Sequence, residues 1–134
     1  MMLSAALIAA PAFAKIPAKV TSAFQARYTA AANLEWSRMV GSYKASFDMG
    51  GYRLQARFDR KGRWLGSEKM IGKEGLPATV RDNFRKSAYG RWEIKSTYEE
   101  YLPNEMPSYH ITAAKGDFKR KSLMFDHRGQ LMNG

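Results

Sequence analysis

The chain has 134 residues, with 22 basic against 12 acidic side chains, a net charge of +10 and no cysteine. It can therefore form no disulfide, and a chain of this length can bury enough surface to fold without a structural metal. Apolar residues make up 45% of the sequence, which argues against intrinsic disorder. The composition indicates one globular domain.

The first fourteen residues are predicted to be an export signal. Residues 3–10 are a short apolar run, Pro11 interrupts it, and residues 12–14 (Ala-Phe-Ala) have the small-x-small pattern that a signal peptidase recognises. We expect cleavage before Lys15, giving a mature chain, residues 15–134, that is periplasmic or secreted. The alternative is an ordinary N-terminal helix packed on the domain. Since no lysine or arginine precedes the apolar run, we also expect the natural reading frame to start further upstream.

No transmembrane segment is expected, because a membrane-spanning helix needs about 20 apolar residues and no segment of the chain approaches that length.

An internal duplication organises the remaining residues. Two sequence patterns, I/L-P-A-x-V-x-x-x-F and F-D-x-x-G-x-W/L, each occur twice and in the same order. Self-similarity of this kind predicts two copies of one supersecondary unit within a single domain. The first pattern lies at residues 16–24 and 76–84, the second at 58–64 and 125–131, and the two predicted repeats are residues 16–71 and 76–134.

Each copy is predicted to begin with a short helix. Pro17 and Pro77 suit the first turn of a helix, where the missing N–H would be unpaired in any case. Apolar residues then recur every four positions, which gives each helix one apolar stripe. The stripes consist of Val20, Phe24 and Tyr28 in the first copy and Val80, Phe84 and Ala88 in the second.

After each helix, apolar and polar residues alternate, which is typical of strands with one buried face. Asp and Gly residues between the alternating segments suit tight hairpin turns. Each copy is therefore predicted to be a helix followed by an antiparallel meander, with the helix on the apolar face. The residues expected to face inward are Leu34, Trp36, Tyr43, Ala45, Phe47, Tyr52, Leu54, Ala56 and Phe58, then Trp92, Ile94, Tyr109, Ile111, Ala113, Leu123 and Phe125.

The last strand of the second copy differs in length from its counterpart. Tyr52 and Phe58 are six positions apart, whereas Phe118 and Phe125 are seven apart. We therefore predict a β-bulge within residues 119–124.

In tandem and behind a signal sequence, the I/L-P-x-x-V-x-x-x-F helix, the L-x-W strand and the F-D-x-x-G-x-W/L hairpin resemble the PepSY-like family of exported bacterial proteins, also described as β-lactamase-inhibitor-protein-like. The resemblance covers about residues 16–131. It implies an α+β fold in which two tandem helix-plus-antiparallel-sheet repeats form one continuous antiparallel sheet with the helices packed on one face. It also implies an inhibitor or binding role outside the cytoplasm.

The sequence offers little for catalysis or metal binding. His110 and His127 have no partner at metal-ligand spacing, and the chain has neither a nucleophile motif nor a phosphate-binding loop. Glu99 and Glu100 are adjacent, so on a strand they face opposite sides and cannot act as a general acid/base pair. We therefore expect a protein that is not an enzyme and that uses no cofactor and no metal.

Positive charge is the remaining feature. The alternation directs several basic side chains to the sheet face away from the helices, where they could form a basic stripe that attracts polyanions. The alternative is that these charges only keep the sheet soluble and protect its edges. Most aromatic residues lie in the inward frame, and Trp64 is the candidate exception. The candidate binding surface consists of Lys44, Arg53, Arg57, Arg63, Trp64, Lys119 and Lys121.

Three hypotheses follow. The first is a noncatalytic, monomeric binding module that engages an envelope or secreted protein. The second is a binder of anionic envelope polymers or lipid head groups through the basic face, and the third is a small enzyme. Nucleic acid is not an expected partner, because an exported protein does not meet it and the aromatic residues are not interleaved with the outward charges.

Overall fold

The computed structural model describes residues 15–133, so the predicted signal lies outside the described residues. The chain divides into two compact units, the first ending at Ser67 and the second beginning at Glu68. Each unit contains one of the two predicted repeats almost entirely. That the repeats form a single domain stays a prediction.

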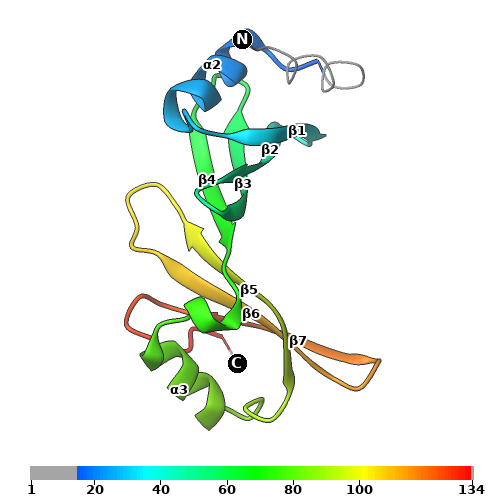
Figure 1. The fold of residues 1–134 in the computed structure, drawn as a ribbon, viewed down its shortest axis with the longest axis vertical. Coiled ribbons are helices and arrows are strands. Elements are labelled where there is room, and N and C mark those ends of the chain that lie inside the picture. Colours follow the sequence, from blue (N-terminus) through cyan, green and yellow to red (C-terminus); the bar gives the residue numbers. More distant parts are fainter. Residues whose placement is uncertain (1–14, 134) are drawn as a thin grey trace. The chain divides into compact units, whose positions relative to one another are not determined.

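The described residues form an α+β fold with a seven-stranded sheet in the strand order β1 to β7. Each unit contains one α-helix and the meander that follows it (Figure 1). The predicted fold class is therefore confirmed. The elements are α2 (Ala18–Arg27), β1 (Ala32–Met39), β2 (Ser42–Met49), β3 (Tyr52–Asp59), β4 (Trp64–Met70), the short 3-10 helix η2 (Lys73–Gly75), α3 (Ala78–Lys86), β5 (Glu93–Tyr101), β6 (Ser108–Lys115) and β7 (Lys119–Phe125).

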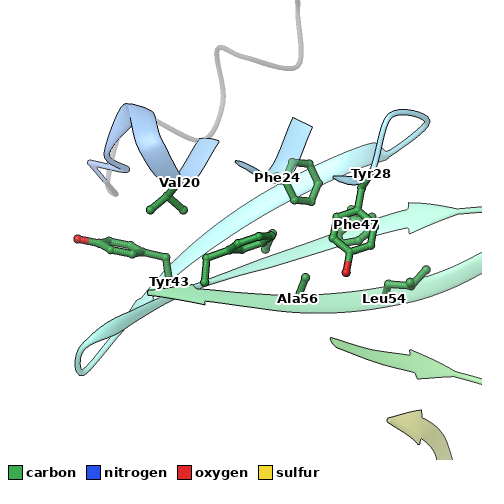
Figure 2. Close-up of a cluster of buried hydrophobic side chains, with 9 residues drawn as sticks. Val20, Phe24, Tyr28, Tyr43, Phe47, Leu54 and Ala56 are labelled. Carbon is green, nitrogen blue, oxygen red and sulfur yellow. The ribbon is translucent and has the colours of Figure 1, made fainter. Parts of the chain in front are cut away.

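The core of the first unit forms where α2 packs on β1–β3 (Figure 2). Val20 and Phe24 of the helix are buried, as the four-residue spacing predicts. The Phe47 ring lies 4.9 Å from the Phe24 ring and 4.8 Å from the Tyr28 ring, measured between ring centres. Pairs of aromatic rings in such geometries add roughly 0.5–1.5 kcal/mol each beyond the burial of their surface. Three interlocked rings therefore hold the C-terminal end of α2 on the sheet.

The second unit repeats this arrangement with fewer rings. Val80 and Phe84 of α3 are buried against β6 and β7, where Ile111 and Phe125 are fully buried. At the position that matches Phe47 the second unit has Ala113. Each of these residues lies four positions after a tyrosine, Tyr43 or Tyr109, that pairs with the phenylalanine of the F-D-x-x-G motif. The two cores therefore differ at the end of the helix.

An aspartate closes the same turn after β3 and after β7. The Oδ1 atom of Asp59 accepts hydrogen bonds from the backbone N–H groups two and four residues further along the chain, both at 2.9 Å. Asp126 makes the same two bonds at the same distances. The pKa of each carboxyl lies below its ordinary value, mainly because of the hydrogen bond from the backbone N–H four residues further along the chain. Partial desolvation of the carboxyl acts in the opposite direction. The aspartate of the repeated motif is therefore a turn cap.

The glycine of the same motif lets the turn lie against the helix. Gly62 and Gly129 have φ angles of 86° and 89°, which L-residues with a side chain rarely adopt. A Cβ atom at Gly62 would lie 2.6 Å from the carbonyl oxygen of Lys19, and one at Gly129 would lie 2.7 Å from Oγ1 of Thr79. Lys19 and Thr79 occupy matching positions in α2 and α3. The two units thus use the same glycine-to-helix contact.

The predicted bulge within residues 119–124 is wrong. β6 and β7 pair in an unbroken register from Tyr109 opposite Phe125 to Lys115 opposite Lys119. Phe118 lies in the turn between these strands and is 96% exposed. The extra residue is absorbed there, because residues 116–118 connect β6 to β7 whereas only residues 50–51 connect β2 to β3.

Irregular pairing occurs instead on the first strand of each meander. The register shifts in β1 between Ala32 and Glu35, and in β5 between Ile94 and Ser96. A bulge reverses the face to which the following side chains point. The shift in β5 therefore brings Thr97 to the helix side, where it is buried, and sends Tyr98 to the other face.

We expect Gly62→Ala and Gly129→Ala to destabilise the protein more than Gly50→Ala. All three glycines have positive φ, so each alanine incurs the roughly 1–2 kcal/mol cost of left-handed backbone. Only at Gly62 and Gly129 does the new Cβ also overlap with a helix, which adds roughly 1–3 kcal/mol. Gly50 is the matched control because no atom lies within 4 Å of its added Cβ. Urea unfolding measures the three losses, and equal losses would contradict the glycine-to-helix contact.

The capping aspartates predict an acid-sensitive fold. Because the pKa of Asp126 is lower in the folded protein, its charged form stabilises the fold above about pH 4, and this contribution disappears as pH falls through the lowered pKa. Asp126→Asn should therefore make the free energy of unfolding depend less on pH between about 5 and about 2. Asp117→Asn, in the exposed turn before β7, is the control. An unchanged slope for Asp126→Asn in chemical denaturation across this range would contradict the prediction.

Candidate functional site

In the first unit, the sheet face opposite the helix carries a row of three aligned side chains. Ser37 of β1 lies opposite Lys44 of β2, which in turn lies opposite Arg57 of β3. Within residues 15–133, neither Lys44 nor Arg57 has an ion pair or a side-chain hydrogen bond. Two of the seven predicted residues therefore lie together on the open face with their charges uncompensated. We call Ser37, Lys44 and Arg57 the first open-face row.

Arg53 also lies on the open face, but its charge is paired. Its guanidinium lies 3.1 Å from the carboxylate of Asp48 and 3.7 Å from that of Glu35. Asn33 donates a further hydrogen bond to Asp48 at 2.8 Å. The hydrogen bonds from Asn33 and Arg53 hold the pKa of the Asp48 carboxyl below its ordinary value. Arg53 is thus part of a polar network at one end of the hairpin and adds little net charge to the surface.

Arg63 and Trp64 do not belong to the open face. Arg63 lies in the turn after β3 and pairs with Asp59, the capping carboxylate. Trp64 packs against the core of the first unit, so the prediction that it belongs to the outward surface is wrong. The guanidinium of Arg27 lies 3.6 Å from the centre of its indole ring. The Nε1 atom of Trp64 is buried and has no hydrogen-bond partner among residues 15–133.

Lys119 and Lys121 lie on the helix side of the sheet, so the prediction that they extend the basic stripe is wrong. They alternate in phase with Leu123 and Phe125, both of which are buried against α3. The Nζ atom of Lys121 lies 5.6 Å from the centre of the Tyr89 ring. The predicted bulge would have separated these lysines from the phase of Leu123 and Phe125, but the register is unbroken and all four side chains share one face.

The second unit has a matching row on its open face, with different chemistry. Tyr98 of β5 lies opposite His110 of β6, which lies opposite Met124 of β7. These residues occupy the positions of Ser37, Lys44 and Arg57, because in both units the middle residue directly follows the tyrosine that pairs with Phe58 or Phe125. We call Tyr98, His110 and Met124 the second open-face row. All three side chains are half-buried.

The acidic residues of β5 point to opposite faces, as predicted. Glu100 accepts or shares a hydrogen bond with Nε2 of His110 at 2.9 Å on the open face, where the two side chains are only 14% and 26% exposed. Glu99 lies on the helix side, accepts a hydrogen bond from the Tyr109 hydroxyl at 3.3 Å and pairs with Lys69 at 3.5 Å. Burial, followed by the charge of Glu99, raises the pKa of Tyr109. Each carboxylate is therefore committed to a neighbour in the sheet.

Further chemistry of the described residues is limited. His127 lies exposed in the turn that Asp126 closes. Between residues 15 and 133, no three His, Cys, Asp or Glu side chains gather closely enough to hold a metal ion. Neither α2 nor α3 has the length and apolar character required to cross a membrane.

Solved structures with this arrangement of two helices and a meandering sheet are similar to the chain over most of its length. A DUF2874 family protein from Bacteroides ovatus is 23% identical, with a TM-score of 0.85 over 90% of this chain and 86% of that one. A BLIP-like protein from Bacteroides fragilis is also 23% identical, with a TM-score of 0.83 over 91% of this chain and 86% of that one. A protein from Bacteroides eggerthii, described provisionally as periplasmic, is 21% identical, with a TM-score of 0.84 over 90% and 88%.

These similarities establish the fold as BLIP-like. No family model matches the sequence, and no curated protein matches it either. The β-lactamase-inhibitor-like part of the resemblance is thus confirmed for the fold, whereas membership of the PepSY-like family stays a prediction.

Tyr98 and Met124 are not among the seven residues of the predicted binding surface. The outward position of Met124 could have been predicted, because it lies between the inward residues Leu123 and Phe125. The outward position of Tyr98 could not have been predicted, because alternation from Ile94 places it inward and only the register shift in β5 turns it outward.

We expect Lys44→Glu to stabilise the protein by roughly 0.2–1 kcal/mol, because it replaces two like charges on opposite strand positions with an opposite-charge pair. Lys44→Gln should give a smaller gain. Arg60→Glu, in the exposed turn after β3, controls for the change in net charge. Urea unfolding at low salt measures the effect, which should shrink at about 1 M salt. Loss of stability on Lys44→Glu at low salt would contradict the prediction.

Proposed function

We propose that the mature chain is a noncatalytic exported binding module that binds a protein of the cell envelope through the open face of β5–β7. The fold similarity to a BLIP-like protein and to a protein described provisionally as periplasmic supports a binding role and this location. The predicted signal over residues 1–14 supports export. Fold alone does not define function, so the proposal depends on the surface described next.

The second open-face row is the observation that carries the proposal. The two units share most of their core positions and the turn that the capping aspartate closes, yet at the same three surface positions one has Ser, Lys and Arg while the other has Tyr, His and Met. Tyrosine and methionine are enriched in protein interfaces, and lysine is depleted. Tyr98 and Met124 contribute nothing to the helix-side core, because they point away from it. A continuous row of this composition across three strands favours contact with another protein.

The surroundings of the second row fit the organisation of a binding patch. His110 is held by Glu100, so its ring is positioned before any partner arrives. Thr112 and Ser122, the next pair of residues along β6 and β7, provide a polar border. Energetically important residues of interfaces are commonly central and surrounded by weaker contacts that exclude water. We infer that Tyr98 and Met124 are the central contacts.

The alternative function is binding of anionic envelope polymers or lipid head groups through the first open-face row. It is favoured by the uncompensated charges of Lys44 and Arg57. It is weakened by the pairing of Arg53 and Arg63 with carboxylates, and by the location of Lys119 and Lys121 on the other face. Of the predicted basic stripe, only Lys44 and Arg57 remain as a surface for a polyanion.

The test is affinity capture from a native envelope extract with tagged residues 15–134, washed at salt concentrations from about 50 to about 500 mM. Tyr98→Ser/Met124→Arg gives the second row the residues found at the matching positions of the first. Lys44→Glu/Arg57→Glu is the matched variant of the first row. We expect one discrete protein to survive the high-salt wash with the unmodified chain and with Lys44→Glu/Arg57→Glu, and to be lost with Tyr98→Ser/Met124→Arg.

Two results would overturn the proposal. Retention of a protein that is indifferent to Tyr98→Ser/Met124→Arg would place the interface elsewhere. Capture of only anionic lipid or polysaccharide, released by about 200 mM salt and abolished by Lys44→Glu/Arg57→Glu, would make the first row the functional surface. Circular dichroism of both double variants verifies that they are folded.

A further inference from the structure

Two adjoining cavities of the second unit are lined by residues of α3, of β5 and of the connection between them. Their volumes are about 410 and about 440 Å³, within the usual range of ligand sites. They share Arg85, Gly90 and Trp92. The first, which we call the apolar cavity, is also lined by Leu76, Phe84 and Ile94 and by the charged residues Lys73, Glu74, Arg81 and Glu93. The second, the cationic cavity, is also lined by Ser87, Ala88, Arg91 and Lys115.

Hydrogen bonds and ring packing hold the segment between the two cavities, residues 87–92, in place. Ser87 donates a hydrogen bond through Oγ to the carbonyl oxygen of Phe84 at 2.7 Å and accepts one from the N–H of Tyr89 at 3.1 Å. A Cβ atom at Gly90 would overlap with the carbonyl group of Arg85, so only glycine allows the chain to pass this close to the helix end. The Tyr89 ring meets the Trp92 ring nearly edge-on, 4.9 Å away between ring centres. The position of Trp92 is therefore fixed before a ligand binds.

The space arises where the two repeats differ. In the first unit Tyr28 follows α2 and its ring fills the corner beside Phe47 (Figure 2). The aligned positions in the second unit are Ala88 and Ala113, and the connection from helix to strand is residues 87–92 in place of 28–31. In the second unit the longer connection supplies Ala88, Gly90 and Arg91 to the lining of the cationic cavity, while the Tyr89 and Trp92 rings pack on the core.

The charges around the cationic cavity are of one sign. Its lining contains Arg85, Arg91 and Lys115 and no acidic residue. Arg85 also pairs with Asp82, but within residues 15–133 Arg91 and Lys115 have no ion pair. Lys119 lies directly opposite Lys115 on β7 and adds to the positive potential. A single anionic group near Arg91 and Lys115 would be favoured by this arrangement.

The apolar cavity suits the remainder of an amphipathic ligand. Leu76 and Phe84 in its wall are each only 3% exposed, so its accessible apolar surface comes from the half-buried side chains of Ile94 and Trp92. Of the charged residues in its lining, Glu93 is paired with Lys95. We propose that the second unit binds an acyl-chain monocarboxylate, a fatty acid, with its chain against Ile94 and Trp92 and its carboxylate between Arg91 and Lys115. Arginine suits this role because its planar group can hold both carboxylate oxygens.

The test uses the mature chain labelled with 5-fluorotryptophan, which gives one fluorine resonance for each of its three tryptophans. Trp92→Phe assigns the relevant signal. Titration with decanoate, below its micelle concentration, should shift the Trp92 signal saturably and leave the signals of Trp36 and Trp64 in place. Decyltrimethylammonium, which has the same chain and a positive head group, should cause no saturable shift.

Two variants of the cationic cavity and one control variant test where the head group binds. Arg91→Gln/Lys115→Gln should weaken decanoate binding by about tenfold or more, which corresponds to about 1.4 kcal/mol. Arg60→Gln/Lys61→Gln removes the same charge from a turn of the first unit and should leave the affinity unchanged. Ala88→Tyr introduces the residue type of the first unit into the cavity and should prevent binding while the chain remains folded.

The proposal would be overturned by the absence of a saturable Trp92 shift, by equal shifts with both head groups, or by equal weakening in the two charge variants. The titration contains no protein partner and involves neither open-face row. Its failure is therefore independent of the capture experiment.

Discussion

A glycine in each unit lies directly against the backbone or first side-chain atoms of a helix, and this contact sets how the helix sits on its strands. Gly62 meets Lys19 of α2, and Gly129 meets Thr79 of α3. The adjacent aspartate fixes the turn by binding two N–H groups, so the glycine is presented at one place only. The phenylalanine before it, Phe58 or Phe125, then enters the core beside the helix. The F-D-x-x-G motif is thus a packing device, which explains its recurrence without any catalytic role.

Once the helix is fixed, every strand residue belongs to one of two faces, and irregularities decide which. The shift in β5 sends Tyr98 outward, and the longer turn between β6 and β7 keeps Lys119 and Lys121 on the helix side. The chemistry that distinguishes the two units follows from these local events. A one-residue change in register exchanges the two faces of a strand, whereas an extra residue in a turn leaves the strand unchanged.

This distinction explains how far the sequence could be interpreted. Helices, hairpin turns and inward residues such as Phe47 and Ile111 were predictable, because spacing of four and alternation of two persist within each uninterrupted segment. The outward direction of Lys44 and Arg57 was predictable for the same reason. Trp64 and Tyr98 were misplaced because each lies beyond a turn or bulge across which alternation carries no information. Lys121 was misplaced because a bulge was predicted between it and Phe125, whereas the unbroken strand puts it on the same face as Leu123. The cavities were also beyond reach, because they depend on how a connection folds back onto a helix end.

The excess of positive charge has a different meaning in each unit once its pairing is considered. In the first unit carboxylates neutralise Arg53 and Arg63, and two adjacent cations remain on an open polar face. In the second unit the unpaired cations Arg91 and Lys115 line a cavity whose neighbour is apolar. Charge beside a concave apolar surface can select a ligand by both its head and its body, whereas charge on a flat face attracts any polyanion and weakens with salt. The second unit is therefore better suited to specific recognition of a ligand. The first unit has the same helix and meander without such a cavity.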